Sequence, residues 1–171
     1  MQSVIFWLII TTFIGLVSYV FFRKGIIKLL TFLSISVLAF YLSFVATITI
    51  IARIPSSNAR FSFILFWSYN AIANGEVELI SEIIWNIVLF IPIGLLLMFL
   101  LTCKCKSIIT VAIGILLSVI IELLQLFLHR GLFEFDDIIH NALGTFIAVI
   151  FYFFVYSIGM KIKVYLTGLK D

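Results

Sequence analysis

The stretch ELLQLFLHRGLFEFDDIIHN runs from Glu122 to Asn141 and holds the densest group of ionisable side chains in the chain. It contains four of the eight acidic residues and both histidines, whereas the residues on either side are apolar over long distances. Each flanking run is long enough to cross a membrane as a helix. The stretch therefore predicts two spanning helices that meet at a polar turn, and a functional site at that turn.

The composition places the whole chain in a membrane. Of its 171 residues, 64% are hydrophobic and only 11% are charged, whereas a soluble domain averages about 25% charged residues. Such a chain cannot cover its own surface with polar groups. We expect one membrane domain over residues 1–171, with membrane lipid as a partner and no nucleic acid.

Five apolar runs predict an all-α bundle of about five transmembrane helices, since each is long enough to cross a hydrocarbon core about 30 Å thick. A sixth apolar segment, at 60–69, is rich in aromatic residues but too short to cross. Because Tyr and Trp favour the membrane–water boundary, it is expected to lie in the interface or to be re-entrant, between the second and third spans. The five predicted spans are residues 4–22, 29–51, 82–101, 107–128 and 138–158.

The lysines and arginines predict the orientation, because cytoplasmic loops carry an excess of both. With the N-terminus outside and the C-terminus inside, only Arg53, Arg60 and Arg130 face outward. The cytoplasmic side then holds Arg23, Lys24, Lys28, Lys104, Lys106, Lys161, Lys163 and Lys170. The expected location is a plasma membrane, with the polar turn on the outer face.

Polar residues on three predicted spans share one depth below that face. With a rise of about 1.5 Å per residue, Glu122 lies about 9 Å deep, and Asn86 and Asn141 about 6 Å each. Glu122 and Gln125 lie on one side of their helix, and Asp137 and Asn141 on one side of the next. If these sides face each other, they form a polar pocket that opens outward.

Burying Glu122 in lipid would cost about 2.5–3.5 kcal/mol or more, so it should face the interior and find a partner, for which Arg130 is the nearest candidate. An alternative interpretation is a polar clasp, in which the same groups only hold the helices together. The candidate binding cluster comprises Asn86, Glu122, Gln125, Arg130, Asp136, Asp137 and Asn141.

Other kinds of site have weaker signals. Asp136, Asp137 and both histidines are suitable metal ligands, but His140 points about 100° away from Asn141 on a helix. Cys103 and Cys105 have no further ligand nearby and are expected to be reduced thiols. We expect no metal and no cofactor, and we find no nucleophile beside a base.

Three blocks of the sequence resemble the VanZ-like family of bacterial membrane proteins. The segment NIVLFIPIG, from Asn86 to Gly94, resembles its N-x-x-x-F-x-P-x-G signature. Glu122 and Gln125 resemble its E-x-x-Q block, and Arg130 with the residues from Asp137 to Gly144 resembles its R…D-x-x-x-N-x-x-G block. The resemblance covers about residues 40–155.

This resemblance implies a role in resistance to glycopeptide antibiotics, since the founding member gives low-level resistance to teicoplanin, a lipoglycopeptide. The expected function is an outward-facing pocket that binds a lipid-linked cell-wall precursor or the antibiotic. Two alternatives stay open. One is an enzyme that modifies a lipid head group with Glu122 or Asp137 as acid or base, although catalysis is less expected. The other is a structural protein with a polar clasp.

Overall fold

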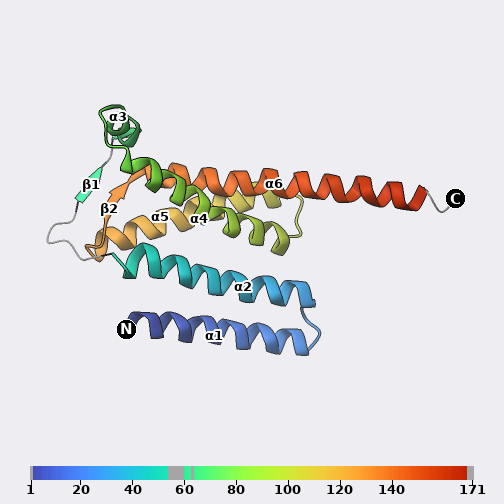
Figure 1. Cartoon of the computed structure of the whole chain (residues 1–171). Coiled ribbons are helices and arrows are strands. Elements are labelled where there is room, and N and C mark those ends of the chain that lie inside the picture. The colour runs from blue at the N-terminus through green and yellow to red at the C-terminus, as the bar shows by residue number, and fades with distance from the viewer. Residues whose placement is uncertain (1, 54–59, 63, 169–171) are drawn as a thin grey trace.

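The computed structural model describes residues 2–53, 60–62 and 64–168, and most of them are helical (Figure 1). Phe63 of the aromatic segment and Lys170 of the charge count lie outside the described residues. The helices are α1 (Gln2–Arg23), α2 (Leu29–Ala46), the π-helical turn η1 (Thr47–Ile51), α3 (Trp67–Ala73), α4 (Glu78–Leu100), α5 (Lys106–Phe127) and α6 (Phe135–Gly168). The strands are β1 (Arg60–Ser62) and β2 (Leu132–Glu134).

Four of the described helical stretches are long and apolar enough to cross a membrane: Leu29–Ile51, Glu78–Leu100, Lys106–Phe127 and Phe135–Tyr165. Helix α1 adds a shorter apolar stretch, Trp7–Arg23. Large hydrophobic side chains are exposed along all of these helices, a surface that is stable against lipid but not against water. The chain is thus a multi-pass membrane protein, and the predicted all-α membrane bundle is confirmed.

Helix α4 lies in the middle of the bundle and contacts α2, α5 and α6. Its buried residues Phe90, Ile93 and Leu97 form the core together with Val45 of α2. Helix α1 packs along α2 at one edge (Figure 1). Helix α6 continues well past the ends of its neighbours, to Gly168 rather than to the predicted residue 158.

Helices α4 and α6 approach each other closely because small residues face each other across their contact. A Cβ atom on Gly94 would lie 2.6 Å from the Cβ of Ala148 and 3.0 Å from the carbonyl oxygen of Thr145. No real Cβ tolerates the first distance, so the helices could not keep this separation with alanine at position 94. Helix α4 also continues through Pro92, a residue that is expected to kink a helix.

At one end of the bundle α2 and α5 end while α4 and α6 begin, and we call this the polar end (Figure 1). Strands β1 and β2 pair there in parallel, with Arg60 opposite Leu132 and Ser62 opposite Glu134. The sequence predicted neither strand. The aromatic segment thus forms β1, a turn and the start of α3, while its place at a membrane interface stays a prediction.

Candidate functional site

Glu122 lies near the end of α5 and is almost completely buried, with 1% of its surface exposed. Its Oε2 accepts a hydrogen bond from the backbone N–H of Glu134 at 3.0 Å. The carboxylate therefore faces the interior of the bundle and fixes the end of β2 against α5.

Arg130 is not the partner of Glu122, so this part of the sequence prediction is wrong. Its Nη1 donates to the carbonyl oxygens of Ile51 at 2.5 Å and of Ile50 and Arg53 at 3.3 Å each. These carbonyls belong to the end of η1 and the residues after it, where a helix leaves acceptors without a partner. The guanidinium caps the α2–η1 helix because this one nitrogen lies within reach of several carbonyls.

Asp136 is buried, with 1% exposed, and its two carboxylate oxygens hold the start of α3. Oδ1 accepts from the backbone N–H of Phe66 at 2.6 Å, and Oδ2 accepts from the N–H and the hydroxyl of Ser68 at 3.0 and 2.6 Å. Phe66 has a left-handed backbone, with φ of 61°. Asp136 supplies the cap that α3 lacks locally, and its oxygens are fully engaged in this structural role.

Asn141 and Gln125 are buried and join neighbouring elements. Asn141 donates from Nδ2 to the Ser118 hydroxyl of α5 at 2.8 Å, and Gln125 donates from Nε2 to the Thr49 carbonyl of η1 at 3.0 Å. The remaining oxygen of each amide is buried without a hydrogen-bond partner. These contacts are of the kind that the clasp interpretation expects.

Asp137 points to a different place from its neighbour in sequence and lines a cavity of about 230 Å³. The cavity lies between the end of α2–η1, the start of α4 and the start of α6. Its lining combines two carboxylates, one guanidinium, one amide and one indole with apolar side chains beneath them. The lining residues are Ile48, Thr49, Arg53, Glu82, Trp85, Asn86, Leu89 and Asp137.

The predicted residues all reach the polar end, but direct hydrogen bonds mostly join them to other groups. Asn86 and Asp137 are the two predicted residues that line the same cavity. The outward-opening polar pocket of the sequence analysis stays a prediction.

Six of the eight lining residues were missing from the predicted set, among them the charged or aromatic residues Arg53, Glu82 and Trp85. Each of these three residues lies at the end of a predicted span or within one helical turn of it. That position at the end of an apolar run is the signal by which the sequence could have identified them.

The chain was also compared with known protein families. A family model described as VanZ/LLP1 matches residues 4–156 of the chain. The chain belongs to the VanZ/LLP1 family. The match begins well before residue 40, where the sequence resemblance was expected to start, so it takes in nearly all of α1. Searches of curated proteins and of solved structures gave no match.

Glu134 of this VanZ/LLP1 protein is the last residue of β2, between the spanning helices α5 and α6. Burial and, to a lesser extent, the negative charge of Asp137 raise the pKa of Glu134 to about 7. The hydrogen bond that Trp67 Nε1 donates to its Oε2 at 3.1 Å and the positive charge of Arg53 act in the opposite direction. The polar end therefore carries a group that changes its charge near neutral pH.

The histidines do not assemble a metal site in the described part of the chain, where no three His, Cys, Asp or Glu side chains converge. His140 is buried, and its Nε2 lies 2.9 Å from the hydroxyl of Tyr69 in α3. His129 is exposed and lies two residues after the end of α5. Its φ of 53° is in the left-handed region.

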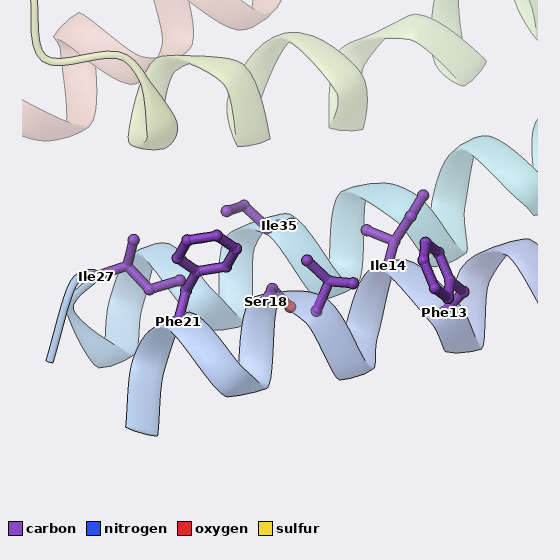
Figure 2. Close-up of a pocket in the computed structure, with 7 residues that line it drawn as sticks. Phe13, Ile14, Ser18, Phe21, Ile27 and Ile35 are labelled. Carbon is purple, nitrogen blue, oxygen red and sulfur yellow. The ribbon is translucent and has the colours of Figure 1, made fainter. Parts of the chain in front are cut away.

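A second hollow has a very different chemistry. Between α1 and α2 lies a groove of about 260 Å³, and Figure 2 shows Phe13, Ile14, Phe21 and Ile35 along it, with the Ser18 hydroxyl as a polar group. No charged side chain lines this groove. In a membrane such a surface is covered by lipid chains, whereas the cavity at the polar end offers specific polar contacts.

Proposed function

We propose that this VanZ/LLP1 protein is a binding protein of the bacterial plasma membrane. Its ligand is the polar part of an amphiphile, either a lipid-linked cell-envelope molecule or a lipoglycopeptide antibiotic of the teicoplanin type. The observation that carries the proposal is the cavity lined by Arg53, Glu82 and Asp137 at the end of apolar helices. A pocket with a few polar groups above apolar walls is typical of small-molecule sites.

The orientation proposed from the sequence puts this cavity on the outer face. Arg53 and Arg130 then lie outside, and the loop between α4 and α5, with Lys104 and Lys106, lies in the cytoplasm. An outward-facing cavity can meet antibiotics that arrive from outside and lipid-linked precursors once they are exposed on the outer face. Binding either kind of molecule there would contribute to glycopeptide resistance.

The test is the resistance phenotype of Asp137→Asn, which keeps the size of the side chain and removes its charge. We expect normal amounts of protein in the membrane and loss of most protection against a lipoglycopeptide. The matched control is Glu76→Gln, an exposed residue outside the cavity lining, which should protect as the wild type does.

The clasp interpretation predicts a different result. Interhelical hydrogen bonds in membranes average about 0.6 kcal/mol, so a neutral isostere would change little if the groups only held the helices together. Normal abundance with unchanged protection in Asp137→Asn would therefore count against binding and favour the clasp.

A further inference from the structure

We propose that the cavity recognises a positively charged amine on an amphiphile, with Asp137 and Glu82 as counter-charges and Trp85 as an aromatic wall. This inference rests on the proposed function, because it names the chemical class that the same cavity binds.

The charge of the cavity favours a positively charged ligand. Two carboxylates, Glu82 and Asp137, line it against one guanidinium, that of Arg53. The charge of Arg53 acts on Asp137. The cavity is therefore short of positive charge.

The nearby Arg130 does not supply that charge. Its Nη1 is held by the carbonyl oxygens of Ile50, Ile51 and Arg53, which fixes the guanidinium as a helix cap. Asp136 differs from Asp137 in the same way, since three protein donors already satisfy it. Asp137 instead lines the cavity, and because a carboxylate accepts up to about four hydrogen bonds, it is placed to accept them from a ligand there.

The aromatic and apolar part of the lining also suits an amine on an amphiphile. Trp85 is 63% exposed and borders the same cavity as Asp137 and Glu82. Bound ammonium groups commonly lie against an aromatic ring, because the face of the ring attracts a cation. Here the indole stands beside two carboxylates. Ile48 and Leu89 complete the wall and suit the methylene groups that carry the amine.

A divalent cation fits this geometry less well than an ammonium does. Calcium takes about 6–8 oxygen ligands, whereas the cavity lining offers the carboxylates of Glu82 and Asp137. In the part of the chain that the structure describes, no three acidic, His or Cys side chains form a metal-like group.

The experiment measures binding of dansylcadaverine, a fluorescent primary amine, to the full chain in phosphatidylcholine nanodiscs at neutral pH. Fluorescence anisotropy reports binding, and empty nanodiscs give the background. The neutral N-acetylated probe has the same fluorophore and tether. We expect the amine to bind about tenfold or more tightly than its acetylated form, as loss of a charge-assisted contact implies. Equal binding of the two probes would overturn the inference.

Variants separate charge recognition from mere folding. Asp137→Asn should weaken amine binding about tenfold, and Glu82→Gln, at an exposed position, should weaken it by a smaller factor. Arg53→Gln removes a repulsive charge and should strengthen amine binding, whereas a site for an anionic group would lose affinity. The control Glu78→Gln lies on α4 outside the lining and should bind as the wild type. Weaker amine binding by Arg53→Gln would contradict the proposal.

Competition identifies the source of the amine. Phosphatidylethanolamine in the nanodiscs tests a lipid head group, and teicoplanin tests the antibiotic, each against its N-acetylated form. Displacement of the probe by the free amines only would support the inference. If Asp137→Asn abolishes protection while amine and amide bind alike, the ligand class is wrong but the proposed function stands. If protection and binding are both unchanged, both fail.

Discussion

Asp136 and Ser68, which are 68 positions apart in the chain, are joined by two hydrogen bonds, from the backbone N–H of Ser68 at 3.0 Å and from its hydroxyl at 2.6 Å. The next residue, Asp137, instead lines the cavity. Two adjacent aspartates thus have separate tasks: one fixes α3 to the bundle and the other faces a hollow.

The first prediction concerns the structural aspartate. Asp136→Asn should lower the free energy of unfolding by about 2–3 kcal/mol, because one carboxylate oxygen is replaced by an amide that cannot accept from Phe66 or Ser68. Thermal unfolding of the purified protein in nanodiscs measures this change. Glu76→Gln, in the loop between α3 and α4, serves as the control. An Asp136→Asn protein as stable as the control would show that the cap is dispensable.

The second prediction concerns the contact between α4 and α6. Gly94→Ala places a methyl group against Ala148 and the main chain of Thr145 and should destabilise the protein by about 1–3 kcal/mol. In α1, Gly15 has nothing within 4 Å of the corresponding position, so Gly15→Ala should leave stability unchanged or slightly raised. Equal melting temperatures for the two variants would mean that the helices can separate without cost.

The third prediction concerns pH. The pKa of Glu134 is about 7 in the folded protein and about 4.3 in an unfolded chain. The folded state therefore binds the proton more tightly, so the contribution of Glu134 is most favourable below the unfolded pKa and declines as pH rises through about 7. Glu134→Gln should flatten this decline in unfolding experiments between about pH 5 and 8. A wild-type slope that persists in the variant would assign it to other groups.

The fourth prediction concerns orientation. A Gly75→Cys variant should react with a membrane-impermeant thiol reagent in intact cells, because the loop between α3 and α4 is expected outside. The exposed thiols Cys103 and Cys105 lie on the opposite loop and should react only after the cells are opened; they are replaced by serine when Gly75→Cys is tested. Labelling of the native cysteines in intact cells would reverse the orientation.

The sequence predicted the spanning helices well because each is a long apolar run bounded by charges. It did not predict the pairing of β1 with β2, since strands of three residues carry no periodic pattern and depend on contacts between distant loops. Likewise, Asp136 and Asp137 looked alike as neighbours on one helix. Their tasks differ because a helix turns by about 100° per residue, and the fold places α3 on one side and the cavity on the other.

Arg53 was assigned to another loop and left out of the predicted cluster, whereas Arg130 was expected to neutralise Glu122. The error has a physical cause. Nearness in sequence favoured Arg130, but the uncapped carbonyls at the end of η1 attract its guanidinium more directly. The charge of Arg53 instead acts on Glu122, Glu134 and Asp137.

The π-helical turn η1 has a consequence for how this site can change. A π-turn holds one residue more than an α-helical turn, so everything after Thr47–Ile51 is shifted in phase relative to α2. Deleting one residue there would restore the ordinary helix and rotate Arg53 by about 100° away from its present direction. The amount of positive charge in the cavity is thus set by chain length as well as by residue type. A single-codon deletion could alter ligand preference without replacing any side chain of the lining.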